Sequence, residues 1–173
     1  MNKKVISWIL VFCWMSFIFF LSSMNADNST KTSKGFIYNT IGNIIRFSNE
    51  IGLSNVQNID EVVDKLDWPV RKTAHIFEYF VMAILLCYAV KNSGVRPSIK
   101  MVIVAVAICC LYACTDEWHQ EFVSGRSGRL KDVSIDLGGS IMGSILFLWI
   151  WEIRHRDINV LKRNEKKIEK EFK

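Results

Sequence analysis

The chain has 173 residues, of which 50% are hydrophobic, and its formal net charge is +5. The hydrophobic residues form blocks near the roughly 20-residue length that crosses a bilayer, which excludes an ordinary soluble domain. Much of the positive charge lies after Trp151, so the charge balance does not require a nucleic-acid partner. We therefore predict one all-α integral membrane domain.

The first predicted span covers residues 5–22. Lys3 and Lys4 precede it, as basic residues precede the hydrophobic part of a signal peptide. Residues 22–26 match a cleavage site poorly, so we interpret the segment as a retained transmembrane helix.

A long segment connects the first and second spans. Residues 25–34 are polar and are expected to form a mobile loop. Isoleucines in residues 35–52 recur near helical spacing, which predicts an amphipathic helix that lies at the membrane interface or caps the bundle. A second short helix is predicted over residues 60–67, and Trp68-Pro69 is expected to end it because proline disfavours a helical conformation of the preceding residue.

Three further spans are predicted downstream, at residues 73–90, 101–118 and 133–151. The distribution of lysine and arginine between the connecting segments places both termini in the cytoplasm. The predicted fold is a compact four-helix bundle, N-in and C-in, with short amphipathic extracellular helices between its first two spans. Residues 1–153 would form the membrane domain, and residues 154–173 a charged cytoplasmic tail, expected to be a solvated helix.

Three spans bring ionisable or polar residues to the predicted outer end of the bundle. The sets are Arg71, His75 and Glu78 on the second span, Asp116, His119 and Gln120 on the third, and Asp132 and Asp136 on the fourth. Helical spacing within each set places its side chains on one face. Charged side chains within a membrane cost free energy unless they are paired, protonated or hydrated, so such a cluster indicates a functional site.

The face of the fourth span that carries Asp136 also carries Gly139 and Gly143. A G-x-x-x-G pair lets two helices approach closely. We therefore expect this face, with its aspartates, to point into the bundle.

The loop between the third and fourth spans is basic, against the usual preference for basic loops in the cytoplasm. Arg126, with Arg129 and Lys131, could neutralise the neighbouring acids or bind an anion, and Arg126 suits bidentate contact with a phosphate or carboxylate. Gly125 and Gly128 would let the loop turn tightly and bring backbone N–H groups close to a ligand. The alternative is that these acids and bases only form ion pairs that set the register of the helices.

Two pairs are candidates for acid–base chemistry: His75 with Glu78, and Asp116 with Glu117. A divalent metal is a further hypothesis, although the sequence contains no recognised metal-binding spacing. The candidate metal ligands are Asp116, Glu117, Asp132, Asp136 and His75. The sequence identifies no other cofactor.

The motif R-K-x-x-H-x-x-E-Y in the second span, together with D-E-x-x-Q-x-F-x-x-G-R after it, resembles the VanZ-like family. The stretch FFLSS at the end of the first span is similar to a short serine signature of that family, so the resemblance covers residues 5–150. The matching positions are Arg71, Lys72, His75, Glu78, Tyr79, Asp116, Glu117, Gln120, Phe122, Gly125, Arg126 and Asp132, with Asp136 fitting loosely.

The resemblance implies a multi-pass protein of the bacterial plasma membrane. The namesake of the family is linked to low-level resistance to teicoplanin, a lipoglycopeptide antibiotic, and has no assigned biochemical activity. On this basis the expected ligand-binding residues are Arg71, Lys72, Tyr79, His119, Gln120, Gly125, Arg126, Asp132 and Asp136.

Three functions are compatible with these residues. A membrane enzyme would act on an anionic envelope lipid or a peptidoglycan precursor. A non-catalytic protein would bind the same headgroup, or a partner membrane protein through residues 35–52, and would reduce antibiotic access. A small transporter is disfavoured, because four spans without broken helices or repeats leave little room for alternating access unless the chain oligomerises.

Overall fold

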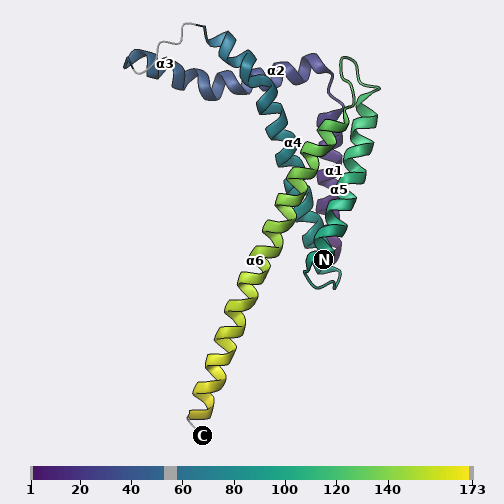
Figure 1. Ribbon diagram of the computed structural model, residues 1–173, viewed down its shortest axis with the longest axis vertical. Helices are drawn as coiled ribbons and strands as arrows, with labels where there is room; N and C mark the ends of the chain where they lie inside the picture. Colours follow the sequence, from purple (N-terminus) through teal and green to yellow (C-terminus); the bar gives the residue numbers. More distant parts are fainter. Residues whose placement is uncertain (1, 53–57, 172–173) are drawn as a thin grey trace.

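The structure is a computed structural model that describes residues 2–52 and 58–171, with side chains as far as Arg156. Figure 1 shows the arrangement, and the described part of the chain is helical throughout, without strands. The elements are α1 (Lys3–Ser22), α2 (Ala26–Ile37), the π-helical turn η1 (Tyr38–Gly42), α3 (Asn43–Glu50), α4 (Ile59–Asn92), α5 (Ile99–Gln120) and α6 (Leu130–Glu171).

Each of the four predicted spans is found as a helix. α1, α4, α5 and the Leu130–Arg156 part of α6 are long and apolar enough to cross a membrane. α6 continues from its apolar part into the charged tail without a break as far as Glu171, and the last two residues of the predicted tail lie outside the described residues. Figure 1 shows the start of α1 at the lower end of the bundle and α6 continuing below it, so both lie on the same side, and the assignment of that side to the cytoplasm stays a prediction.

α4 packs against α1, α5 and α6, and its most extensive contact is with α6. The α4–α6 approach depends on Gly139 and Gly143, because a Cβ at either position would overlap a backbone carbonyl oxygen of α4, that of Ile76 or Phe80. This confirms the expected inward-facing glycine pair. The buried core beside it includes Val11, Ile18, Tyr79, Met82, Leu86, Ala105 and Cys109.

The predicted helix break at Trp68-Pro69 is wrong. α4 runs continuously from Ile59 to Asn92 with Pro69 inside it. Proline removes one helical N–H, but the turns before it are held by contacts with α2, where Lys34 Nζ lies 2.6 Å from Asp64 Oδ1 and Ser33 donates to Asp67. These tertiary contacts stabilise a helical path that local preference alone disfavours.

The mobile loop expected at residues 25–34 is also wrong, because most of this segment belongs to α2. Asn25 caps the helix, and its side chain accepts a hydrogen bond from the backbone N–H of Asn28 at 2.9 Å. Thr30 accepts a hydrogen bond from Arg71 of α4 at 3.4 Å. The contacts of α2 with α4 supply hydrogen-bond and ion-pair partners, and these stabilise a helix whose polar composition predicts a loop.

The predicted amphipathic helix at residues 35–52 is present as the end of α2, η1 and α3. Figure 1 shows this run projecting sideways beyond α4 at the upper end of the bundle, away from α1 and α5. Its large exposed apolar side chains are Phe36, Tyr38, Ile44, Phe47 and Ile51. Such a face is what a position at the membrane interface requires, and the extracellular location stays a prediction.

Replacing Asp67 with alanine is expected to loosen α2. Asp67 accepts a hydrogen bond from Ser33 of α2, so its loss removes a direct contact between α2 and α4. Asp67 also lies 3.9 Å from Arg71 of its own helix, which donates to Thr30 of α2, so a second contact with α2 loses its support. Amide exchange across α2 should accelerate by about tenfold, the effect of losing roughly 1.4 kcal/mol, in hydrogen-exchange mass spectrometry of the full chain. Glu61→Ala is the control, since Glu61 pairs with Lys65 of the same helix, and equal acceleration in both variants would contradict the expectation.

Candidate functional site

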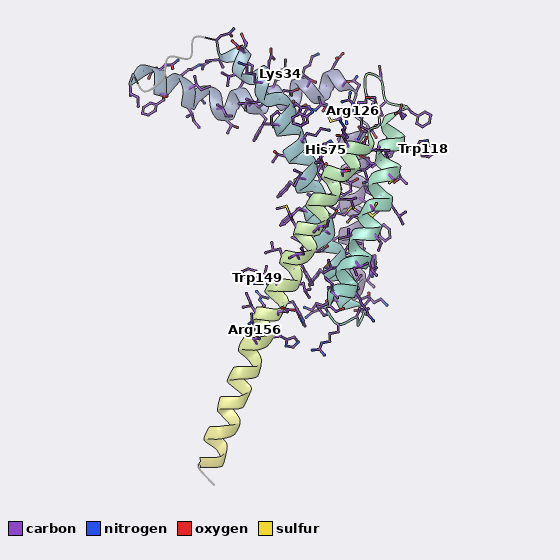
Figure 2. All side chains as sticks on the ribbon, in the orientation of Figure 1. Lys34, His75, Trp118, Arg126, Trp149 and Arg156 are labelled. Atoms are coloured by element: carbon purple, nitrogen blue, oxygen red, sulfur yellow. The ribbon has the colours of Figure 1, made fainter. Side chains whose placement is uncertain are left out.

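The structure brings the polar residues of three helices together at one end of the bundle. Figure 2 shows His75 of α4 and Arg126 of the α5–α6 loop close together there, and both line one cavity. Asp116 and Glu117 enter from the end of α5, and Asp132 and Asp136 from the start of α6. The convergence expected from helical spacing is therefore present in the fold.

The acids at the end of α5 form a buried network of their own. Gln120 Nε2 donates to Asp116 Oδ2 at 3.1 Å and to Glu117 Oε1 at 3.4 Å, and all three residues are buried. The second Glu117 oxygen accepts from the backbone N–H of Arg129 at 2.7 Å. The Asp116–Glu117 pair is thus held by an amide and a loop N–H, which orients both carboxyl groups.

The loop glycines have the roles that a tight turn requires. Gly125 adopts a φ of 75°, in the region that favours glycine, and a Cβ at Gly128 would overlap the backbone oxygen of Glu117. The loop N–H groups do not all point to a ligand site, however. That of Gly128 donates to Glu121 Oε1 at 2.9 Å, and that of Arg129 to Glu117, so these two are occupied by the chain's own acids.

The basic side chains differ in how they are paired. Lys72 Nζ lies 2.6 Å from Asp132 Oδ1 and joins α4 to α6, and Arg71 lies 3.9 Å from Asp67. Arg126 forms no ion pair with any described residue, and its Nε is buried without a hydrogen-bond partner. Burial, followed by repulsion from Arg71, lowers the pKa of the Arg126 guanidinium from its ordinary value. Since arginine keeps its proton, this marks a place where an anion would be stabilised.

His75 lies between two carboxyl groups. Its Nδ1 is 3.5 Å from Glu78 Oε2 and 4.0 Å from Asp136 Oδ1, and it hydrogen-bonds to no described residue. Asp136 is 1% exposed, and neither of its carboxyl oxygens has a hydrogen-bond partner in the described chain. Buried carboxyl groups beside an imidazole are an arrangement suited to taking up and releasing a proton.

Two cavities meet at this cluster. The first, which we call the basic cavity, has a volume of about 240 Å³ and is lined mainly by polar and basic residues, including Lys72, Gln120 and Arg129. The second, the apolar cavity, has a volume of about 640 Å³ and lies among α1, α2 and α4. The residues that line both cavities are Arg71, His75 and Arg126.

Some expected site residues lie outside these cavities. His119 contacts Ser23 through Nε2 at 3.2 Å and packs on Phe19, and it lines a separate cavity on another side of α5. Phe122 lines that cavity as well. Tyr79 is completely buried in the core, and its hydroxyl has no partner among the described residues. Asp116 lines this separate cavity together with His119, as their helical spacing predicts. Asp116, Glu117 and Asp136 line neither the basic nor the apolar cavity, because helical spacing does not determine which neighbouring helix a side chain meets.

The metal hypothesis depends on carboxylates and His75 lying close enough to share one ion. Within residues 2–52 and 58–171, no group of three or more His, Cys, Asp or Glu side chains has the geometry to hold a metal ion. The functions developed below therefore rest on the cationic and acid–base groups alone.

Sequence reasoning missed the contribution of α2 to the site. Ser29, Ser33 and Phe36 line the apolar cavity from this helix, together with Thr32. Ser29, Ser33 and Phe36 are spaced i, i+4 and i+7, the pattern of one helix face, so the signal was present within a segment that its polarity marked as a loop.

The Lys72–Asp132 pair is expected to be structural. Both side chains are less than one-fifth exposed, so Lys72→Met should lower the free energy of unfolding by about 1.5–3 kcal/mol by leaving Asp132 unpaired. The double exchange Lys72→Asp with Asp132→Lys should recover most of the loss. Thermal unfolding of the purified protein in detergent measures both, and an unchanged melting temperature in Lys72→Met would contradict this role.

Comparison with known proteins identifies a family for most of the chain. The family model described as VanZ/LLP1 matches residues 7–151, which include most of α1, all of α2 to α5, and α6 as far as Trp151. No curated protein and no solved structure matches the chain. The match covers the membrane helices and every residue of the polar cluster. The chain is therefore a membrane protein that belongs to the VanZ/LLP1 family.

Proposed function

We propose that this protein binds the anionic headgroup of a cell-envelope lipid or peptidoglycan precursor in the basic cavity, at the outer face of the bacterial plasma membrane. The observation that carries the proposal is Arg126, a half-buried cation without an ion-pair partner in the described chain. Arg71 lines the same cavity, so two guanidinium groups face one space. A phosphate or carboxylate placed there would accept hydrogen bonds from both.

The pairing of the other charges argues against a purely structural cluster. Glu117 accepts from a loop N–H, Asp132 pairs with Lys72, and Arg71 contacts Asp67, so much of the network is satisfied without Arg126. Burial of the Arg126 guanidinium without an ion-pair partner is unfavourable, and the attraction of Asp116, Glu117 and Glu78 offsets only part of that cost. A binding role accounts for that cost, whereas a role limited to setting helix register does not.

We further propose a role in teicoplanin resistance, which the family resemblance and the proposed binding both support. Teicoplanin acts on the cell envelope, and a protein that holds an envelope precursor at the membrane surface would reduce the access of the antibiotic to it. Resistance should then depend on Arg126, and a susceptibility test with cells that express wild-type or Arg126→Gln protein at equal abundance examines this directly.

Catalysis on the bound headgroup is the second candidate. His75 favours it, because this side chain lines both cavities and lies 3.5 Å from Glu78. A general base in that position would be adjacent to a ligand held by Arg71 and Arg126. A non-catalytic accessory protein with the same pocket would need the arginines but not the histidine–carboxylate pair.

Lipid and precursor profiling separates the two candidates. Cells with wild-type, Arg126→Gln and Glu78→Gln protein are compared with cells that lack it, after equal membrane abundance is verified. If the protein is an enzyme, wild-type cells should differ from cells that lack the protein in at least one envelope lipid or precursor pool. Both variants should abolish that difference. A binder predicts unchanged pools, with co-purification of an anionic envelope component that only Arg126→Gln abolishes. If Arg126→Gln neither alters a pool nor removes a bound component, the proposed binding function is wrong.

A further inference from the structure

The apolar cavity is a feature that anionic binding alone does not explain. Its volume, about 640 Å³, is that of a site for a drug-sized ligand, and its lining includes Leu21, Phe36, Val70 and Phe77. A soluble anion bound in the basic cavity would leave the apolar cavity unoccupied. A ligand that fills both cavities must therefore have an apolar part as well as an anionic one.

The position of the charged residues connects the two cavities. Arg71, His75 and Arg126 line both, so an anionic group held by the two arginines lies at the boundary between a polar and an apolar space. The headgroup side is lined by the α5–α6 loop and the start of α6, through Gly125, Ser127 and Asp132. This is the polarity pattern of an amphiphile, with one charged end and one hydrocarbon end.

The apolar cavity also reaches the surface of the bundle. Phe77 of α4 and Phe36 of α2 line it and are 59% and 61% exposed. α4 is one of the candidate spans, so the exposed Phe77 lies on a surface suited to lipid contact. A hydrocarbon chain could enter from the bilayer at this surface without crossing water.

We propose that the apolar cavity holds the hydrocarbon chain of a single phosphate-bearing membrane lipid whose phosphate lies between Arg71 and Arg126. This inference rests on the proposed function, and it adds the class of ligand and the path of its chain. Two guanidinium groups match the two negative charges of a phosphate monoester better than the single charge of a carboxylate. α2 serves as the cover of the chain site, since Ser29, Ser33 and Phe36 line it and Asp67 holds the helix in place.

Photolabelling tests the path of the chain. The full-length protein is placed in nanodiscs doped with phosphatidic acid that carries a diazirine in its acyl chain, and labelled residues are mapped by mass spectrometry. Labelling should concentrate on the segments of α2 and α4 that line the apolar cavity. The same diazirine chain on phosphatidylcholine, which has no net negative charge, should label the lipid-facing surfaces without this concentration.

Two matched variants separate cavity filling from general disturbance. Ala74 of α4 lines the apolar cavity and is exposed, so Ala74→Phe should fill the cavity without disturbing the core. A bound chain would then have to displace the phenyl ring, an overpacking cost within the usual range for inserted bulk. Labelling of the cavity should therefore fall about tenfold, which corresponds to about 1.4 kcal/mol. Ala107 of α5 is also exposed and lines none of the three cavities described here, so Ala107→Phe should leave labelling unchanged.

A soluble probe distinguishes failure of this inference from failure of the proposed function. Binding of inorganic pyrophosphate, measured by titration calorimetry, should be weakened by Arg126→Gln and unaffected by Ala74→Phe. The chain site is wrong, and the anion site stands, if pyrophosphate binding needs Arg126 but the photolabelling does not fit the cavity. The photolabelling does not fit if it is uniform over the surface, or if Ala74→Phe does not change it. If neither probe depends on Arg126, both proposals are wrong.

Discussion

Replacing Arg126 with glutamine is expected to weaken binding of inorganic pyrophosphate by about 10- to 100-fold, the loss produced by removing a charge-assisted hydrogen bond of roughly 1.5–3 kcal/mol. Arg126 lines both cavities, and its buried Nε has no hydrogen-bond partner in the described chain, so the fold leaves part of its donor capacity unused. Titration calorimetry of the purified protein at fixed ionic strength measures the change.

The same substitution should leave the fold as stable as before, or slightly more stable. Arg126 contributes no ion pair to the described network, and its pKa is lowered by burial and by the neighbouring Arg71, so the native state gains little from its charge. A melting temperature equal to or above that of the wild type is therefore expected. A lower melting temperature with unchanged pyrophosphate binding would identify Arg126 as a structural residue instead.

Arg46→Gln is the matched control for charge. Arg46 lies on α3, is exposed, and lines none of the described cavities, so the substitution removes one positive charge without touching the site. Long-range attraction between exposed charges is screened within about 8–10 Å at physiological salt. The affinity for pyrophosphate should therefore change by less than about twofold. A loss equal to that of Arg126→Gln would show that the effect of Arg126→Gln comes from the net charge of the protein and not from a contact with the ligand.

Gly139→Ala is expected to lower the free energy of unfolding by about 1–3 kcal/mol or more. The added Cβ would overlap the backbone carbonyl oxygen of Ile76, and a backbone atom cannot move aside as the tip of a side chain can. The α4–α6 contact would have to open, which would also displace Asp136 from His75. Unfolding in detergent, followed by helix content, measures the loss.

The neighbouring glycine supplies the control for this prediction. A Cβ at Gly138 would meet no atom within 4 Å, and Gly138 is exposed on the same helix. Gly138→Ala should be neutral or slightly stabilising, because alanine is favoured over glycine in a helix by roughly 1 kcal/mol. Similar destabilisation by both substitutions would mean that helix packing is not the cause.

The features that sequence reasoning predicted correctly depend on local pattern. Four apolar blocks predicted the four helices that could cross a membrane, because hydrophobic length is a property of one segment at a time. The spacing of Gly139 and Gly143 predicted the inward face of α6, and Asp136 on that face is buried. Helical period is sufficient for such conclusions because it relates residues within one helix.

The errors concern segments whose structure depends on partners far away in the chain. Pro69 was expected to end a helix, and residues 25–34 to form a loop, yet Ser33–Asp67 and Lys34–Asp64 hold two helices together across both. Composition describes each segment as if it were alone in water. It carries no information about a neighbour that supplies the missing hydrogen bonds or charges.

The amino-acid sequence by itself determined that this protein is a helical membrane protein of the VanZ/LLP1 family, and that three of its helices bring a cluster of ionisable residues to one end of the bundle. Only the tertiary structure decided which of those residues share a space. It separated His119 from the basic cavity, paired Lys72 with Asp132, and left Arg126 at the boundary of two cavities. The physical reason is that helical periodicity gives the direction of a side chain relative to its own helix, whereas a cavity exists only between helices.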